Sequence, residues 1–390
     1  MSVESSYIVS ARKYRPSTFD SVVGQKHITS TLQNAIASGQ LAQAFLFCGP
    51  RGVGKTTCAR ILAKTINCMS ITPDVEACNT CESCTSFNSG ASLNIIELDA
   101  ASNNSVDDIR ELVQQINVPP MNGRYKVYII DEVHMLSQSA FNAFLKTLEE
   151  PPSYVKFILA TTEKHKILPT ILSRCQIFDF HRITVKDISD HLENISVKEN
   201  VKYEKEALDI IAEKADGGLR DALSMFDLMV SFTDGNLTYK AVVESLNILD
   251  YDYFFRFTEF MLNGDMPSAL MLFDEILSKG FQGDIFINGL MSHLRNLLVS
   301  QDSQTIPLLN VPENVKDRYF SQSSLTPRLF LLRALDFANT SSIEYRGADN
   351  KRLCVELMLM KICNIMNKLN KQIQTQNTVA AQQNAEKKKI

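Results

Sequence analysis

Residues 44–57 read AFLFCGPRGVGKTT. The apolar run Ala44–Phe47 is typical of a buried strand, and residues 49–56 match the pattern G-x-x-x-x-G-K-[ST]. In that pattern the glycines let backbone N–H groups fold around phosphates, Lys55 neutralises the β- and γ-phosphate oxygens, and Thr56 binds Mg²⁺. A helix is expected directly afterwards, over Thr57–Asn67. The stretch therefore predicts a strand, a phosphate loop and a helix that together bind ATP with Mg²⁺.

Three further apolar runs follow this unit, at residues 94–98, 126–130 and 156–160, with helical patterns between them. Strands that alternate with helices predict a parallel sheet covered on both faces. The helix expected over Gln138–Glu150 carries an apolar face and ends before two prolines, and that face consists of Phe141, Phe144, Leu145 and Leu148. We therefore expect an α/β nucleotide-binding domain over residues 1–182.

After Arg182 the strand-like runs stop and the pattern becomes helical. Thr184 is the expected N-cap of a first helix, with Ile188, Leu192 and Ile195 on its buried face. Gly217-Gly218 is the expected C-cap of a second helix. These features predict a small helical domain over residues 183–242.

A second helical region is expected over residues 243–367. In it, Thr326 is the expected N-cap of a helix with Pro327 at its first position. The apolar face of the last helix is expected at Leu353, Leu357 and Met360. Residues 368–390 are rich in Gln, Asn and Lys and are predicted to be a disordered tail.

The composition sets limits on the class of protein. The 390 residues are 45% apolar and 22% charged, which excludes a disordered chain, a fibre and a disulfide-stapled miniprotein. No apolar run approaches the roughly 18 residues of a membrane span, and residues 1–16 lack the apolar core of a signal peptide, so we expect no membrane association and a cytoplasmic protein. Because the net charge is −4, contact with nucleic acid requires a local basic patch.

An acidic pair, Asp131-Glu132, follows the strand expected at residues 126–130. ATP hydrolysis needs a carboxylate near the metal and a group that polarises the attacking water, and these two residues suit those roles in that order. An acidic pair alone is weak evidence, since many are solvated strand ends. Together with the phosphate loop it predicts an ATPase. His134 has no independent chemical role in this pattern.

Four of the nine cysteines lie within seventeen residues, at Cys68, Cys78, Cys81 and Cys84. Four thiolates with C-x2-C spacings suit the closed tetrahedron of a structural Zn²⁺ site. The alternative is a set of free buried thiols or redox cysteines. The other five are isolated and are expected to be packing residues, namely Cys48, Cys58, Cys175, Cys354 and Cys363.

Longer stretches of the sequence resemble a known family. The segments DEVHMLS at 131–137, NAFLKTLEEPP at 142–152, ATTE at 160–163 and LSRC at 172–175 are similar to the AAA+ clamp-loader ATPases of bacterial DNA polymerase III, and in particular to their gamma/tau branch. The resemblance covers about residues 7–367. It implies an AAA+ domain with a zinc module at about 68–84, a helical lid domain and a helical collar domain that oligomerises.

The resemblance also assigns roles to single residues. It implies that Thr162 is a sensor at the end of the fourth strand, that Arg174 is an arginine finger for a neighbouring subunit, and that Arg220 contacts nucleotide from the lid. Each of these arginines would place a cation near developing phosphate charge. Residues 14–25 resemble the segment that packs around adenine, although a simple packing arm is an alternative. The predicted Mg²⁺ ligands are Thr56 and Asp131, and the predicted nucleotide contacts are Tyr14, Arg15, Pro16, Val22, Val23, Gly49, Gly52, Val53, Gly54, Lys55, Thr56, Thr57 and Arg220.

The function implied is that of a motor subunit which uses ATP to load a sliding clamp onto primer–template DNA. The implied partners are delta- and delta-prime-type subunits, further copies of the chain in a hetero-pentameric ring, the clamp and DNA. Membership of the holoenzyme would group the chain with DNA-directed DNA polymerases. Two alternatives are a non-hydrolysing replication scaffold and a related AAA+ DNA motor such as a branch-migration helicase. The cysteine cluster, and a helical region after residue 243 where a winged DNA-binding domain would be expected, disfavour the helicase.

Overall fold

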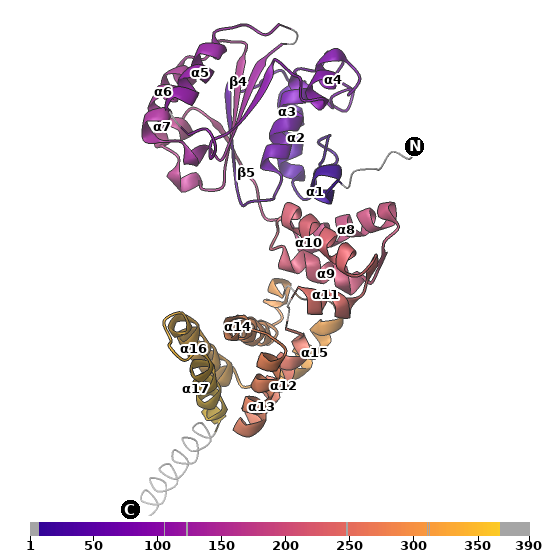
Figure 1. Ribbon diagram of the computed structural model, residues 1–390, viewed down its shortest axis with the longest axis vertical. Helices are drawn as coiled ribbons and strands as arrows, with labels where there is room; N and C mark the ends of the chain where they lie inside the picture. Colours follow the sequence, from indigo (N-terminus) through magenta and orange to yellow (C-terminus); the bar gives the residue numbers. More distant parts are fainter. Residues whose placement is uncertain are drawn as a thin grey trace, which may run out of the picture. The chain divides into compact units, whose positions relative to one another are not determined.

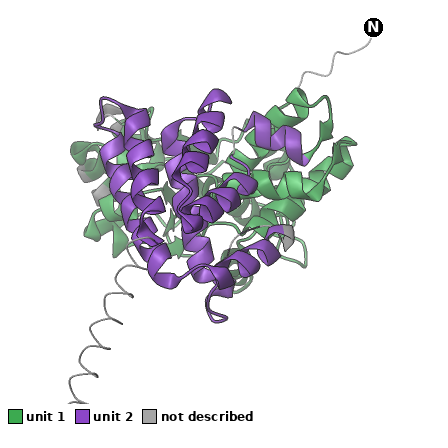
Figure 2. Ribbon diagram, turned by 90° about the horizontal axis from the view of Figure 1, so that it is seen from below, with its two compact units in different colours: residues 1–238 green, residues 239–390 purple. Residues whose placement is uncertain are grey.

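The structure is a computed structural model that describes residues 8–104, 106–121, 124–246, 249–309, 311 and 313–366. The disordered tail predicted at 368–390 lies outside the described residues. The chain forms two compact units, residues 1–238 and residues 239–390, which Figure 2 shows in different colours.

A five-stranded parallel sheet forms the centre of the first unit (Figure 1). Its order is β2-β3-β4-β1-β5, with strands β1 (Ala44–Cys48), β2 (Ile95–Asp99), β3 (Lys126–Asp131), β4 (Val155–Thr161) and β5 (Gln176–Asp179). The central strands are buried almost throughout because helices cover both faces. The predicted fold class is therefore confirmed, but strand β5 was missed.

Helices α2 (Lys26–Ala37) and α3 (Lys55–Ile66) cover one face of the sheet, and α5 (Val106–Ile116) and α6 (Gln138–Glu149) cover the other (Figure 1). The remaining helical elements of this domain are short, namely α1 (Ser10–Lys13), α4 (Glu82–Asn88), α7 (Pro169–Leu172) and the 3-10 turns η1 (Val133–Met135) and η2 (Lys164–Lys166). The two apolar layers that result fix the sheet between them, so the carboxyl ends of its strands are held in place.

The phosphate loop passes directly into α3, which begins at Lys55 and not at residue 57 as expected. Gly54 precedes the helix with φ of 102°, a left-handed conformation that glycine adopts without strain. Lys55 and Thr56 therefore belong to the first turn of the helix, where the backbone N–H groups point outward from its end.

Three longer helices follow in the first unit: α8 (Val185–Glu199), α9 (Lys205–Lys214) and α10 (Leu219–Phe232). The N-cap at Thr184 is confirmed, since its hydroxyl accepts a hydrogen bond from the Asp187 N–H at 3.1 Å. The C-cap predicted at Gly217-Gly218 is wrong, because α9 ends at Lys214 and its C-cap is Ala215, whose N–H donates to the Ile211 carbonyl. Gly217 instead reverses the chain with φ of 80°, so close to Arg182 that a Cβ would lie 2.6 Å away.

The expectation that strands stop after Arg182 is wrong for two short pieces. Strands β6 (Lys202–Tyr203) and β7 (Asn236–Leu237) pair in parallel within the helical part of the first unit. A two-residue strand is too short for an alternating pattern to reveal it. The pair ties the end of α8 to the segment after α10.

The described part of the second unit is helical. Its elements are α11 (Tyr239–Ser245), α12 (Tyr251–Asn263), α13 (Met266–Ser278), α14 (Gly283–Val299), η3 (Ile306–Leu308), α15 (Glu313–Leu325), α16 (Arg328–Tyr345) and α17 (Lys351–Cys363). Helices α12 to α17 enclose an aromatic-rich core that includes Phe257, Phe273 and Phe286. Among the described residues of the chain, no helix combines the length and the apolar character needed to cross a bilayer.

Two predictions for this unit are wrong. Pro327, not Thr326, stands at the N-cap of α16, and the Thr326 hydroxyl donates to the Gln322 carbonyl of the preceding helix at 2.7 Å. Leu353 and Leu357 are 44% and 46% exposed, and the buried face of α17 consists of Val355, Met358, Leu359, Ile362 and Cys363. Helix α17 has apolar residues around most of its circumference, so the sequence alone did not distinguish its buried face.

Candidate functional site

The first unit contains a cavity of about 750 Å³ beside the phosphate loop, a size typical of small-molecule sites. Most of the predicted nucleotide contacts line it: Tyr14, Arg15, Pro16, Val22, Val23, Gly52, Val53, Gly54, Lys55, Thr56, Thr57 and Arg220, together with Asp131 and Glu132. Three predicted residues, Gly49, Thr162 and Arg174, are not part of the lining.

The phosphate loop is held in a conformation that only small residues allow. At Gly49, which follows β1, an added Cβ would lie 2.4 Å from the Phe180 carbonyl oxygen. Lys55 is buried, and its ammonium donates to the Gly49 and Pro50 carbonyls at 2.8 and 2.7 Å. Burial lowers the pKa of Lys55, while the carboxylates of Glu132 and Asp131 oppose that shift. The loop therefore presents one desolvated cation beside two acids.

The two predicted Mg²⁺ ligands meet although 75 positions separate them. Thr56 is on the first turn of α3, and its hydroxyl donates to an Asp131 carboxylate oxygen at 2.6 Å. Asp131 is the last residue of β3, so the sheet places its side chain at the carboxyl edge, next to the phosphate loop. A hydroxyl and a carboxylate are hard oxygen donors of the kind that Mg²⁺ prefers, so this pair fits the ion.

Glu132 lies at the same edge in a left-handed backbone conformation, with φ of 48° and ψ of 44°. Its carboxylate accepts hydrogen bonds from the Thr162 N–H at 3.2 Å and the Thr162 hydroxyl at 3.0 Å. Thr162 directly follows β4, the neighbour of β3 in the sheet. The predicted sensor therefore contacts the predicted water-polarising residue directly.

His134 has a place in this network that the sequence did not suggest. Its Nδ1 lies 3.0 Å from the Thr161 hydroxyl and 3.4 Å from a Glu132 carboxylate oxygen, and its Nε2 lies 3.1 Å from Glu163. Only 6% of the side chain is exposed. The ring thus packs behind Glu132 and links the ends of β3 and β4.

The two predicted arginines lie in different places. Arg220, on the first turn of α10, lines the cavity, and its N–H donates to the Gly52 carbonyl at 3.4 Å. Arg174, just after α7, forms an ion pair with Glu149 at 2.9 Å and donates to the Thr170 carbonyl at 2.7 Å. The structure therefore brings Arg220 to the cavity beside the phosphate loop of its own chain and keeps Arg174 outside the cavity lining.

The sequence analysis missed several residues of this cavity, including Asp99 and Ala101 near the end of β2 and Leu219 and Leu223 on α10. The topology could have indicated the first pair, because the carboxyl ends of neighbouring parallel strands meet at one edge. The two leucines belong to no sequence motif that could have identified them. With Val22 and Val23 they contribute apolar surface to the cavity lining.

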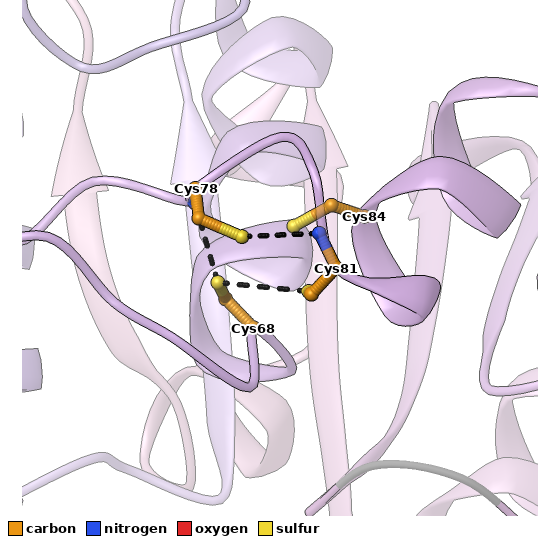
Figure 3. A group of neighbouring side chains, drawn as sticks. All are labelled: Cys68, Cys78, Cys81 and Cys84. Atoms are coloured by element: carbon orange, nitrogen blue, oxygen red, sulfur yellow. Dashed lines mark hydrogen bonds between the residues drawn. The ribbon is translucent and has the colours of Figure 1, made fainter.

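The four clustered cysteines converge between α3 and β2 (Figure 3). Their sulfur atoms all lie within 4.8 Å of one another, and the Sγ atoms of Cys68 and Cys81 are 4.0 Å apart. A tetrahedral zinc site with Zn–S bonds of about 2.3 Å would hold its sulfurs roughly 3.8 Å apart, so the cluster fits Zn²⁺.

Hydrogen bonds favour the deprotonated form of one of these thiols. Bonds from Thr80, and from the Cys81 N–H at 3.3 Å, lower the pKa of Cys78 to about 5. The thiolate is the form that binds metal. Burial acts in the opposite direction on Cys84 and raises the pKa of that thiol. A bound cation would supply the charge that such a buried thiolate needs.

Comparison with known proteins gives a consistent picture. A family model described as DNA polymerase III, delta subunit, matches residues 24–184, and one described as the ATPase lid domain of a DNA polymerase III clamp loader subunit matches residues 187–235. Among solved structures, the RuvB Holliday junction branch migration motor of Thermotoga maritima aligns with 64% of this chain and 79% of its own at 19% identity, with a TM-score of 0.46. A similarity of that size carries no argument about function.

Curated relatives cover more of the chain. DNA polymerase III subunit tau of Bacillus subtilis is 40% identical over 92% of this chain, and subunit tau of Escherichia coli is 42% identical over 76% of it. The chain spans 63% and 46% of the length of these two relatives. DNA polymerase III subunit gamma of Buchnera aphidicola from Acyrthosiphon pisum is 40% identical over 91% of this chain and 98% of its own length. With this identity over nearly the whole of a relative, the chain belongs to the gamma/tau family of DNA polymerase III subunits.

Proposed function

We propose that this chain is an ATP-hydrolysing motor subunit of a bacterial clamp loader, which loads a sliding clamp onto primed DNA. The observation that carries the proposal is the meeting of Lys55, Thr56, Asp131, Glu132 and Arg220 around one cavity of the first unit. A site that only bound nucleotide would need the phosphate loop alone. Hydrolysis also requires a carboxylate near the metal and a fixed group that polarises the attacking water. The acidic pair and the hydrogen bond between Glu132 and Thr162 meet these requirements.

Each residue at the cavity has a chemical task. Lys55 and Arg220 neutralise phosphate charge, and Glu132 accepts a proton from, or orients, the attacking water, with Thr162 fixing its carboxylate. Thr56 and Asp131 would hold Mg²⁺, which when bound neutralises the β- and γ-phosphate oxygens. The apolar and aromatic lining contributed by Tyr14, Val22, Val23, Leu219 and Leu223 suits the adenine base.

The position of Arg174 supports a shared site. Its side chain is 35% exposed and it lies outside the cavity lining of its own chain, so it is available to a neighbouring molecule. An arginine finger supplied by another subunit makes hydrolysis depend on assembly. We infer a ring that combines copies of this chain with delta- and delta-prime-type subunits.

The second unit supports the same assembly. Several large apolar side chains on α15, α16 and α17 are exposed, namely Leu325, Leu329, Leu332, Ile343, Leu353 and Leu357. Exposed apolar side chains in this number favour a protein interface. We assign residues 243–367 to an oligomerisation collar, residues 183–242 to a lid and residues 1–182 to the ATPase domain.

In this proposal ATP shifts the population of the assembly. The ATP-bound form opens the clamp and grips primer–template DNA, and hydrolysis releases both. The chain itself hydrolyses ATP, and a classification as DNA polymerase would rest on its membership of the holoenzyme. The cysteine cluster would be a structural zinc site. Because chromosomal replication takes place there, we place the protein in the cytoplasm.

The decisive experiment mixes two variants of the full chain in the presence of the partner subunits. Glu132→Gln should bind ATP but hydrolyse it slowly, and Arg174→Ala should lose activity because its neighbours lack a finger. Loss of such a finger commonly costs about 10³–10⁵ in turnover. In a mixture, an Arg174→Ala site beside a Glu132→Gln subunit regains both groups. ATPase activity should therefore exceed the sum of the separate variants and disappear on dilution.

Control measurements separate the alternatives. ATPase is also measured with and without clamp and primed DNA, because a scaffold shows no turnover and a helicase responds to DNA without the clamp. Normal hydrolysis by Arg174→Ala, or mixtures that never exceed the sum of their components, would contradict the shared site.

A further inference from the structure

The segment that covers the base side of the cavity is held from two sides. We call residues 10–23 the strap. Its central residues Tyr14, Arg15 and Pro16 line the cavity, and Phe19 and Val22 are buried in the core beneath it. The position of the strap therefore sets the shape of the predicted adenine pocket.

At its first end the strap is bonded to the lid helices. The Ser10 N–H donates to an Asp227 carboxylate oxygen on α10 at 2.7 Å. Lys13 and Tyr14 both contact the Glu199 carboxylate at the end of α8. These contacts connect the strap to α10, the helix that carries Arg220, and to α8.

Near its middle the strap is connected through Lys64 to the loop that carries the clustered cysteines. This lysine is on α3, the helix that begins with the phosphate loop, and is only 3% exposed. Its ammonium donates to the Ser17 carbonyl of the strap at 3.0 Å and to the Asn79 side-chain oxygen at 2.6 Å. Asn79 stands in the turn between Cys78 and Cys81, with φ of 60°. One buried cation thus joins the strap to the cysteine turn.

A second hydrogen bond joins the strap to the loop that carries the clustered cysteines. The Glu76 carboxylate, two residues before Cys78, accepts a hydrogen bond from the Asp20 N–H of the strap at 3.1 Å. Glu76 is 9% exposed. A buried charge is costly unless its hydrogen bonds are made, so displacement of either the strap or the cysteine turn would remove a hydrogen bond from Lys64 or from Glu76. The two parts are therefore energetically coupled.

We propose that the cysteine-bearing loop, residues 68–84, anchors the strap and thereby sets the affinity of the nucleotide site, with Lys64 and Glu76 as positioning residues. This proposal rests on the proposed ATPase function. Neither residue lines the cavity, so both act through the strap. A metal bound by the four cysteines would fix the turn that presents Asn79, and would act on nucleotide binding without touching the nucleotide.

The test measures the Kd of a fluorescent ATP analogue on the full-length chain. Lys64→Met and Asn79→Gly each remove one partner of the bond, and glycine tolerates the positive φ of position 79. Each variant should raise Kd by about three- to tenfold, the effect of one hydrogen bond on positioning. Asn79→Asp keeps an oxygen acceptor and should restore most of the affinity. In the assembled loader, KM for ATP should rise while kcat at saturating ATP stays unchanged.

Lys156→Met is the matched control. Lys156 is 4% exposed and its ammonium also donates to two carbonyls, those of Leu41 and Ala42, but it lies outside the cavity lining. Its loss should leave Kd unchanged even if it lowers stability. Equal Kd values for Lys64→Met, Asn79→Gly and Lys156→Met, or a fall in kcat at constant KM, would overturn the proposal. Lys55→Ala distinguishes a failure of the strap proposal from a failure of the proposed ATPase function. If Lys55→Ala keeps full affinity for the analogue, the nucleotide site is misassigned. If Lys55→Ala loses affinity while the strap variants do not, only the role of the strap is refuted.

Discussion

The second unit contains a histidine that should make it sensitive to acid. His293, on α14, is 1% exposed and lies between the rings of Phe254, Phe255 and Tyr319. Its Nδ1 is 3.0 Å from the Tyr319 hydroxyl and its Nε2 is 3.2 Å from the Gln322 side-chain oxygen. Because that oxygen can only accept, the ring carries a proton on Nε2.

Burial lowers the pKa of His293 from its ordinary value of 6.5 to about 3, with the charge of Arg318 acting in the same direction and the bond to Gln322 opposing it. The unfolded chain therefore binds a proton at pH values where the folded chain does not, so stability falls as pH decreases below 6.5 and continues to fall until about pH 3. At pH 5, about 1.5 pH units below the unfolded pKa, the loss is roughly 2 kcal/mol at ~1.36 kcal/mol per unit.

The perturbation is His293→Gln, and the assay is hydrogen exchange of the α14 amides at pH 7.5 and pH 5, corrected for intrinsic exchange rates. Comparing the pH-dependent change cancels any constant loss of stability in the variant. Between pH 7.5 and pH 5, the free energy of amide opening in α14 should fall by about 2 kcal/mol more in the wild type than in His293→Gln. His165→Gln, which removes a side chain that is 76% exposed, is the control and should behave as wild type. An equal loss in wild type and His293→Gln would refute the reasoning.

Two further predictions concern the first unit. Lys55→Ala should abolish binding of a labelled ATP analogue, because the phosphate charge loses its buried counter-cation, whereas Glu132→Gln should still bind; unchanged affinity in Lys55→Ala would show that the cavity is not the nucleotide site. Elemental analysis should find about one zinc per chain, and Cys81→Ser should lose it while Cys354→Ser, a substitution outside the cluster, keeps it; a folded and active protein without metal would count against a zinc module.

The central strands could be predicted because both of their faces are buried, which leaves continuous apolar runs such as Ala44–Phe47. The edge strand β5 could not be predicted in the same way, since only Phe178 of its four residues is buried and the pattern is short. The buried face of α17 is a third case. Leu353 and Val355 are equally apolar, and only the packing of the surrounding helices decides which of them is exposed.

The candidate site was likewise predictable only in part. The motif predicted Lys55 and Thr56. The parallel sheet then places Asp131, the last residue of β3, at the carboxyl edge, beside the phosphate loop that leads from β1 to Thr56. The place of His134 and the link through Lys64 could not be read from spacing. Both depend on which side chains of distant segments lie together after folding, and neither residue type has a chemical signature that demands a partner.

The ion pair of Arg174 with Glu149 must also be reconciled with its proposed action on a neighbour. The two side chains are 35% and 50% exposed, and an exposed ion pair of this kind contributes about 0–1 kcal/mol. An arginine finger that accelerates turnover by about 10³ contributes roughly 4 kcal/mol to the transition state. If Arg174 leaves Glu149 to contact the phosphate of an adjacent subunit, the exchange is therefore favourable by several kcal/mol in the transition state. In the proposed ring, the pair within one chain would hold Arg174 at the surface until a neighbour arrives, and it would not compete effectively with that neighbour's phosphate.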